Sequence, residues 1–201
     1  MAASKPEREG LGIRRGGAQY ERIHAQLAKA ALVELAENGY ADFSVDAAAE
    51  RAGVAVRTAY RHYETKRDLA LAAISNMPDY TGWLDGEDSC EQRLRRGIEI
   101  GTAHRQYFVP LLSTCLAHRR SEPILLRVFR SRVLIPRAEA LRTFISEGIA
   151  SGELRADLDV TAVHALEVGL LVAIAAGTLQ AGRGQHRADT LFDLIWPMIA
   201  S

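Results

Sequence analysis

The sequence predicts an all-α protein with two domains. Three observations support this prediction. Apolar residues recur at helical three-and-four spacing, only 6% of the residues are aromatic, and runs of Val, Ile and Thr with period-two alternation are missing. Of the 201 residues 48% are hydrophobic, which is enough for an ordinary buried core. A helical protein is therefore expected, and a cluster of helix-breaking residues after residue 75 divides it.

The N-terminal segment is predicted to be a flexible arm, residues 1–18. It reads MAASKPEREGLGIRRGGA, with glycines and a proline but no apolar period, which is typical of chain without packed structure. A disordered leader is the simpler interpretation. The functional alternative is an arm whose Arg14 and Arg15 reach into the minor groove of DNA.

The first domain is predicted to span residues 19–75. Its first helix starts near Tyr20 and stops at Asn38-Gly39, because the apolar residues share one face and an Asn-Gly pair favours a helix C-terminus. That face consists of Ile23, Leu27, Ala30, Ala31 and Leu35.

Two short helices are expected next. Ser44 is a good N-cap for a second helix over 45–52. Gly53 permits a tight turn into a third helix over roughly 55–63.

A fourth helix over 66–75 is predicted to start after Thr65, which forms a capping-box pattern with Asp68 three residues later. The breakers in SNMPDYTGWLDGEDS then mark the boundary to a second domain, residues 76–201. Longer helices are expected there, with a kink at Pro136. Their predicted ranges are 89–105, 106–119, 122–151, 159–181 and 187–200.

The second and third helices have the spacing of a helix-turn-helix, which places its second helix in the major groove of DNA. The third helix can bury Ala59 and Tyr63, four residues apart, and this leaves a polar face without an internal partner. That face carries Arg57, Thr58, Tyr60, Arg61 and His62. The 25 basic and 25 acidic residues cancel over the whole chain, so a DNA contact must come from this local cluster. The alternative is a solvated charged face, with Tyr60 and Tyr63 as packing residues.

Residues 39–69, GYADFSVDAAAERAGVAVRTAYRHYETKRDL, resemble the tetracycline-repressor-like (TetR/AcrR) transcriptional regulators. The agreement lies at Gly39-Tyr40, Ser44-Val45, Ala52-Gly53-Val54, Thr58, Tyr60-Arg61-His62-Tyr63 and Lys66. The resemblance implies an N-terminal three-helix domain that binds double-stranded operator DNA as a homodimer. It also implies an all-α C-terminal ligand-binding and dimerisation domain, whose small molecule releases the DNA. A constitutive or architectural DNA-binding regulator without an inducer is the alternative.

The resemblance also implies roles for individual residues. Phosphate contacts are implied for Ser44, Tyr60, His62 and Lys66. Contacts to base edges or to the flanking backbone are implied for Val56, Arg57, Thr58 and Arg61. Two positions depart from the family pattern, because Ala55 stands where a capping Ser is frequent and Val56-Arg57 replaces a polar residue followed by a small one. Operator preference therefore cannot be transferred from relatives.

A pocket for an apolar small molecule is expected among helices 106–119, 122–151 and 159–181. Its candidate lining residues are Tyr107, Phe108, Leu111, Cys115, Phe129, Val133 and Phe144. Taken singly, each is more typical of a core than of a ligand contact. Cys115 is either a redox switch or a buried inert thiol, and the second is the simpler interpretation.

The last two helices are predicted to form the homodimer interface. Helix 159–181 is apolar nearly all round, and its small residues allow another helix to approach closely. These small residues are Gly169, Ala173, Ala176 and Gly177. Helix 187–200 adds Leu191, Leu194, Ile195 and Met198. The alternative is that these residues fill the core of the monomer.

The sequence indicates neither an enzyme nor a protein with a metal or cofactor. A nucleophile elbow, a Gly-rich phosphate loop and a paired acid-base set are missing, and His164 and Glu167 share a helix face without a second such pair. The two cysteines and the lack of a leader favour a reducing cytoplasm. The uncharged stretch 168–182 is shorter than the roughly 20 residues of a spanning helix, so no membrane contact is expected.

Overall fold

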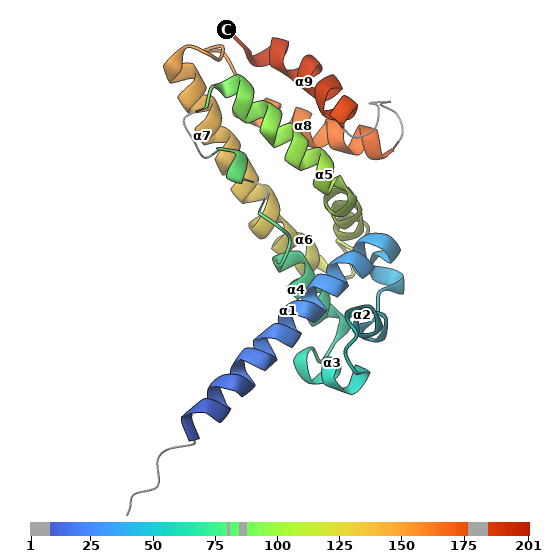
Figure 1. The fold of residues 1–201 in the computed structure, drawn as a ribbon. Coiled ribbons are helices and arrows are strands. Elements are labelled where there is room, and N and C mark those ends of the chain that lie inside the picture. The colour runs from blue at the N-terminus through green and yellow to red at the C-terminus, as the bar shows by residue number, and fades with distance from the viewer. Residues whose placement is uncertain (1–8, 80, 85–87, 177–184) are drawn as a thin grey trace, which may run out of the picture. The chain divides into compact units, whose positions relative to one another are not determined.

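The structure is a computed structural model that describes residues 9–79, 81–84, 88–176 and 185–201. The described residues are helical apart from connecting segments and one isolated β-bridge between Leu154 and Ala200. The predicted all-α fold class is therefore confirmed. The chain divides into two compact units, residues 1–76 and 77–201 (Figure 1).

The first unit is organised by one long helix, α1 (Glu9–Asp42). It begins before the predicted start near Tyr20, and the part of the predicted arm at residues 1–8 lies outside the described residues. Gly39 interrupts the helix with φ 69° and ψ 175°, a conformation that residues with a side chain rarely adopt. The fully buried side chains of α1 are Leu27, Ala28, Ala31 and Leu35.

Three short helices follow: α2 (Val45–Ala52), α3 (Val56–His62) and α4 (Lys66–Ser75). Ser44 caps α2, because its Oγ accepts a hydrogen bond of 3.1 Å from the backbone N–H of Ala47. Gly53 ends α2 in the left-handed conformation at φ 64°. Thr65 and Asp68 form a capping box at the start of α4. The predicted caps of α2 and α4 are confirmed.

Helix α1 holds α2 and α4 in place. Its buried Glu34 accepts a hydrogen bond of 3.0 Å from Nη2 of Arg51 at the end of α2. Gln26 donates a hydrogen bond of 2.6 Å to the carbonyl oxygen of Ala52 at the last residue of α2. The C-terminal end of α2 is thereby fixed, and the turn that leads to α3 starts from this anchored point.

The second unit contains α5 (Cys90–Ala117), α6 (Pro123–Phe129), α7 (Ile135–Ser151), α8 (Val160–Ala175) and α9 (Gln185–Ile199). Two predictions need correction. The ranges 89–105 and 106–119 form one helix, which continues through Pro110. The range 122–151 is divided by a π-helical turn, Arg130–Leu134, just before Pro136, where a missing N–H favours such a turn. The end of the predicted helix 159–181 lies partly outside the described residues.

A core of aromatic and aliphatic side chains joins these helices. Trp83, in a short 3₁₀ helix (Gly82–Leu84), meets Phe144 of α7 edge-on, with the ring centroids 5.2 Å apart. Helix α9 packs along α5 (Figure 1). Phe192 and Ile195 of α9 are buried in the same core. Among the described residues, no helix is both long and apolar enough to cross a bilayer.

Candidate functional site

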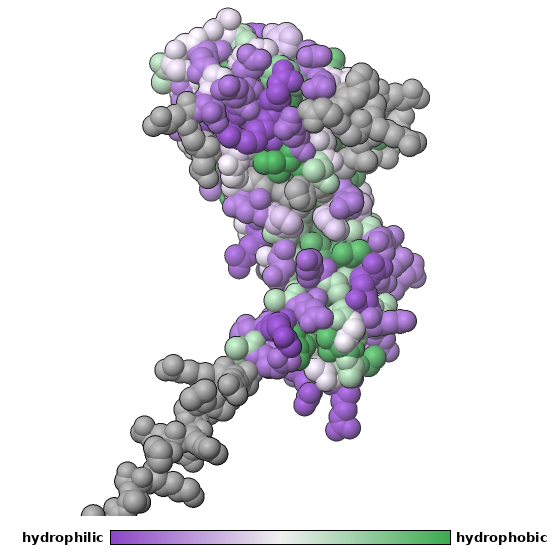
Figure 2. All heavy atoms as spheres, viewed as in Figure 1, coloured by the Kyte–Doolittle hydropathy of each residue, from purple (hydrophilic) through white to green (hydrophobic). Residues whose placement is uncertain are grey.

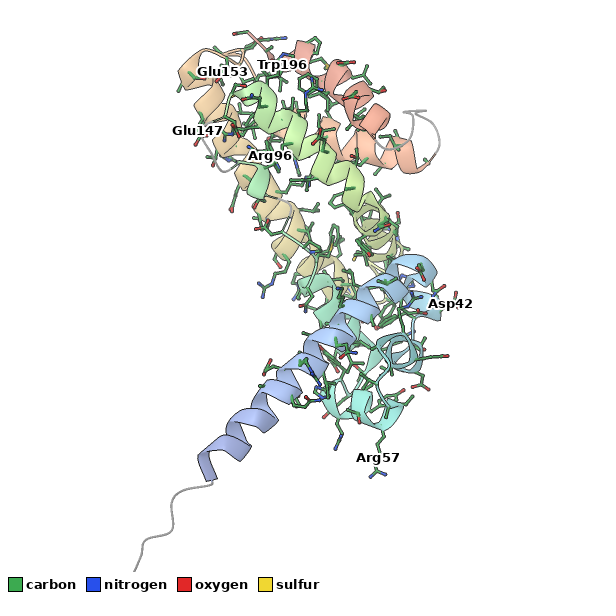
Figure 3. The ribbon with its side chains drawn as sticks, viewed as in Figure 1. Asp42, Arg57, Arg96, Glu147, Glu153 and Trp196 are labelled. Atoms are coloured by element: carbon green, nitrogen blue, oxygen red, sulfur yellow. The ribbon has the colours of Figure 1, made fainter. Side chains whose placement is uncertain are left out.

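Helix α3 presents an outward face to solvent. Ala59 is fully buried, whereas Val56 and Tyr60 expose 42% and 46% of their surface. Arg57 and Arg61 are exposed as well, and Figure 3 shows Arg57 pointing away from the helix. Figure 2 shows hydrophilic side chains projecting from the part of the first unit where α3 lies in Figure 1. The predicted division of α3 into a buried and a polar face is confirmed.

The remaining predicted DNA contacts lie at the edges of this face. Ser44, Thr58, His62 and Lys66 are half-buried. Arg61 Nη2 donates a hydrogen bond of 3.2 Å to Oγ1 of Thr58, so these two side chains support each other along the face. The structure thus places the eight predicted residues on α3, at the N-cap of α2 and at the first residue of α4, and leaves both Arg guanidinium groups at the surface.

Four rings fix the C-terminal end of α3 against α1. His62 stacks on Tyr20 with the ring centroids 4.1 Å apart, and His24 stacks on Tyr63 at 4.4 Å. The Tyr63 hydroxyl also donates a hydrogen bond of 3.1 Å to the carbonyl oxygen of His24. Burial, together with nearby His24 and Arg61, lowers the pKa of His62 below its ordinary value. The position of α3 therefore depends on a cluster of rings from both helices that includes two histidines, His24 of α1 and His62 of α3.

Two of the predicted phosphate contacts already have partners inside the protein. Lys66 Nζ donates hydrogen bonds to the carbonyl oxygens of Tyr40 at 3.1 Å and Ala41 at 3.2 Å. A hydrogen bond to Asp46, with a smaller contribution from desolvation, raises the pKa of Tyr60. These side chains consequently have a structural role in addition to any contact with DNA.

The second unit contains a small cavity with a predominantly apolar lining. Among the described residues that line it, the charged one is Glu167 of α8. The other lining residues are Trp83, Leu94, Gly97, Ile98, Leu141, Phe144, Val163, Leu166, Ile195 and Ile199.

A second, smaller cavity adjoins the first, because the two share Ile98, Glu167 and Ile195. This second cavity is also lined by Thr102 of α5 and Arg137 of α7. Arg137 forms an ion pair with Glu167. Burial opposes the charge of Glu167, but Arg137 and nearby His164 outweigh burial and lower the pKa of Glu167. A charged pair thus separates the two cavities.

Of the seven predicted ligand-binding residues, one lines either of these two cavities. Phe144 lines the larger one, whereas the other six line neither of the two. Phe108 and Phe129 pack against each other instead, with centroids 5.8 Å apart. Leu111 and Val133 are buried, and Tyr107 is half-buried. Burial raises the pKa of Cys115 to about 12, which favours the inert-thiol interpretation over the redox switch.

Sequence reasoning missed Trp83, Arg137 and Glu167 as cavity residues. Trp83 lies in the segment interpreted as a domain boundary, so its burial could not be inferred from periodicity. A signal for Arg137 was present, because it stands four residues from both Val133 and Leu141 on the buried face of its helix. Glu167 was considered only as a metal ligand. Within the described residues, no group of three or more His, Cys, Asp or Glu side chains is placed to hold a metal ion.

The predicted dimer surface is partly exposed. Val172 of α8 exposes 41% of its surface, and Leu194 and Met198 of α9 expose 46% and 53%. Leu191 and Ile195 are buried within the unit. Gly169 and Ala176 are exposed, Ala173 is half-buried, and Gly177 lies outside the described residues. Some of these residues therefore fill the core of the unit and others face outward, and the dimer interface stays a prediction.

A helix-turn-helix with an outward basic face, followed by a helical unit with an apolar cavity, defines a class of one-component DNA-binding regulators. Residues 27–73 match the family described as bacterial regulatory proteins, tetR family. Residues 100–195 match the tetracyclin repressor-like C-terminal domain. The chain belongs to the TetR family of transcriptional regulators, whose members are DNA-binding proteins and not enzymes. No curated protein matches the chain in sequence.

Several solved structures share the fold. A TetR transcriptional regulator from Chloroflexus aurantiacus is 23% identical with a TM-score of 0.68, and the match covers 93% of this chain and 98% of that one. FadR from Bacillus subtilis, in complex with stearoyl-CoA, is 20% identical with a TM-score of 0.60, covering 84% and 95%. The ketosteroid transcriptional regulator KstR2 of Mycobacterium tuberculosis is 18% identical with a TM-score of 0.62, covering 89% and 95%. At these identities the likeness establishes the fold alone.

Proposed function

We propose that the protein is a repressor that binds operator DNA as a homodimer and is released from DNA by an apolar small molecule. One observation carries the proposal above all. The same chain combines an outward, basic recognition helix in its first unit with an apolar cavity inside its second unit. The domains proposed for these tasks are residues 19–75 for DNA and residues 76–201 for the ligand and the dimer.

On the DNA, the eight residues around α3 divide into two groups. Ser44, Tyr60, His62 and Lys66 contact phosphates and set the position of the helix in the groove. The residues that contact base edges or the adjoining backbone are Val56, Arg57, Thr58 and Arg61. Arg57 is the main candidate for reading sequence, because its guanidinium is exposed and a fork of N–H donors suits guanine. Val56 contacts a thymine methyl group, since its exposed side chain cannot form a hydrogen bond.

The dimer forms through α8 and α9. Val172, Leu194 and Met198 expose large apolar side chains on these two helices. A symmetric interface uses the same surface on both protomers, and a dimer supplies the two recognition helices that a two-half-site operator needs.

The ligand enters the cavity between α5, α7, α8 and α9. The lining is apolar apart from Glu167, so the ligand is expected to be largely aliphatic or aromatic. The fold neighbour FadR from Bacillus subtilis is solved with stearoyl-CoA, which supports an acyl compound as a first ligand to test. Ligand and DNA then oppose each other by linkage, so each must weaken the binding of the other by the same factor.

The proposal is tested with an operator selected from a random DNA pool. Fluorescence anisotropy measures the affinity of the protein for this operator with and without a panel of acyl-CoAs, free fatty acids and steroids. At least one ligand should weaken operator binding, and Val163→Phe should weaken the response while operator affinity is retained. Val163 lines the cavity, so a larger side chain there reduces the space for a ligand.

Two results would count against the proposal. Failure to select any DNA sequence would contradict the DNA-binding roles. An operator affinity that no ligand changes, together with no thermal stabilisation by any ligand, would favour the constitutive regulator. A reporter gene under the selected operator decides between repression and activation.

A further inference from the structure

Arg137 is one of two buried arginines in the described part of the second unit, and 91% of its side-chain surface is buried. One of its N–H groups donates to Glu167, and its guanidinium lies 5.7 Å from the centroid of the Phe108 ring. Its Nε is buried and has no hydrogen-bond partner among the described residues. Since an arginine has five N–H donors and a buried donor without an acceptor is unfavourable, Arg137 has capacity for a further acceptor.

The arrangement of the two cavities indicates where an additional acceptor for Arg137 would lie. Of the two cavities, Arg137 and Thr102 line only the smaller one. Gly101 lines it too, and a Cβ at Gly101 would lie 3.7 Å from Nη2 of Arg137, an ordinary van der Waals distance. The larger cavity adjoins it through Ile98, Glu167 and Ile195. The Arg137–Glu167 pair therefore lies where the two apolar cavities adjoin.

We propose that the effector is an elongated aliphatic molecule whose terminal oxygen, a carboxylate or an acyl carbonyl, accepts hydrogen bonds from Arg137 while its chain fills the larger cavity. This inference rests on the proposed ligand-controlled function and names the chemical class of the ligand. Thr102 adds a hydroxyl group beside the bound oxygen. The guanidinium suits such a head group, because its planar fork matches the oxygens of a carboxylate.

Glu167 has a defined part in this site. It occupies Arg137 when no ligand is present and so keeps the buried guanidinium paired. An anionic head group must therefore compete with Glu167 for the same cation. Replacing Glu167 by Gln removes the competing charge but keeps the side-chain shape, and this should strengthen the binding of a carboxylate. A purely structural ion pair would not produce such a gain.

The test uses dodecanoate, dodecanol and dodecylamine, which share one alkyl chain and differ in the head group. Dodecanoyl-CoA is included to distinguish the two possible acceptors for Arg137, the carboxylate of a free acid and the carbonyl oxygen of an acyl thioester. Binding to the full chain is followed by Trp83 fluorescence in a Trp196→Phe background, because the chain has two tryptophans and Trp83 lines the larger cavity. Trp196 stacks on Phe192, so Phe is a conservative replacement.

The expected order is that dodecanoate or dodecanoyl-CoA binds about tenfold or more tightly than dodecanol. Glu167→Gln should tighten dodecanoate binding, and the double variant Arg137→Gln/Glu167→Gln should lose the preference over dodecanol. The double variant avoids an unpaired buried charge, and the single Glu167→Gln variant still tests the inference if the double variant does not fold.

The inference is overturned if dodecanol binds as tightly as both oxygen acceptors, or if Glu167→Gln weakens dodecanoate binding. Tighter binding of dodecylamine would also overturn it, because Glu167 would then be the anchor. Any of these results leaves the proposed function intact when the bound probe still releases the operator. Release by no probe, with unchanged affinity for DNA, would instead contradict the proposed function.

Discussion

Lys66 Nζ, at the first residue of α4, donates a hydrogen bond of 3.1 Å to the carbonyl oxygen of Tyr40 and lies 4.7 Å from the centroid of the Tyr40 ring. It also bonds the carbonyl oxygen of Ala41. A cation near the last carbonyl groups of a helix is stabilising, because these groups have no partner within the helix. Lys66 therefore joins the end of α1 to the start of α4, next to the face proposed to bind DNA.

Lys66→Ala is predicted to lower the free energy of unfolding by about 1 kcal/mol, because two carbonyl groups lose their partner. It should also reduce the slope of log affinity against log salt concentration by roughly one unit, because one phosphate contact is lost. This reduction should be the same for all DNA sequences. Lys29→Ala, on the exposed side of α1, is the matched control. Urea unfolding curves that are the same for both variants would refute the structural role of Lys66.

Gly148 and Leu154 are predicted to be energetically coupled. A Cβ at Gly148 would lie 2.4 Å from Cδ1 of Leu154, so Gly148→Ala should lower the free energy of unfolding by about 1–3 kcal/mol through overpacking. Leu154→Ala removes the two nearest obstructing atoms, leaves Cys90 Sγ at 2.9 Å from that Cβ, and should cost about 2–5 kcal/mol by itself. The double variant should lose less than the two single variants together. Purely additive losses in urea unfolding would contradict the coupling.

His62 is predicted to make the first unit sensitive to acid. Because burial, His24 and Arg61 lower its pKa, the folded protein binds a proton at His62 less readily than the unfolded chain does. Stability should therefore fall as the pH drops through the ordinary histidine range, around pH 6.5. His62→Phe keeps a ring beside Tyr20 and should lose less stability between roughly pH 7.5 and pH 5.5.

The direct measurement is an NMR titration of the His62 ring. Arg61→Ala should raise the pKa of His62, because a nearby positive charge is removed. A His62 that titrates at or above its ordinary value in the wild-type protein would show that the ring is not held in this environment.

Leu194 is predicted to lie in the dimer interface. Leu194→Glu should dissociate the homodimer at micromolar concentration, because it places a charge in an apolar contact. Leu116→Glu is a matched control, since Leu116 of α5 exposes 44% of its surface and Leu194 of α9 exposes 46%. Sedimentation velocity should show a monomer for the first variant and a dimer for the second. Dimers in both cases would exclude the α9 surface.

Local chemistry explains why the first unit could be predicted closely. Ser44, Gly53 and Thr65 are signals that act within a few residues, and each stands where a helix begins or ends. The buried face of α3 also follows from helical spacing. By contrast, the roles of Lys66 and Tyr60 inside the protein depend on contacts with α1 and α2, which no local pattern reveals.

The second unit was harder to predict because its helices are shaped by packing. Pro110 normally stops a helix, yet α5 continues through it. The larger cavity is lined by Trp83, which is distant in sequence from the helices expected to line it. The smaller cavity is lined by the buried Arg137, which pairs with Glu167 of α8. Apolar spacing indicates which residues are inside, but it does not indicate where the packed side chains leave a space.

The central claim, that the face of α3 reads operator DNA, is tested most directly by measuring the affinity of Arg57→Ala for the selected operator and for random DNA. The account predicts a loss of about 1–3 kcal/mol on the operator and a much smaller change on random DNA. Arg142→Ala, on an exposed position of α7, should change neither affinity. If Arg57→Ala folds and retains wild-type affinity for both DNAs, Arg57 does not read the operator and the proposed role of this face is contradicted.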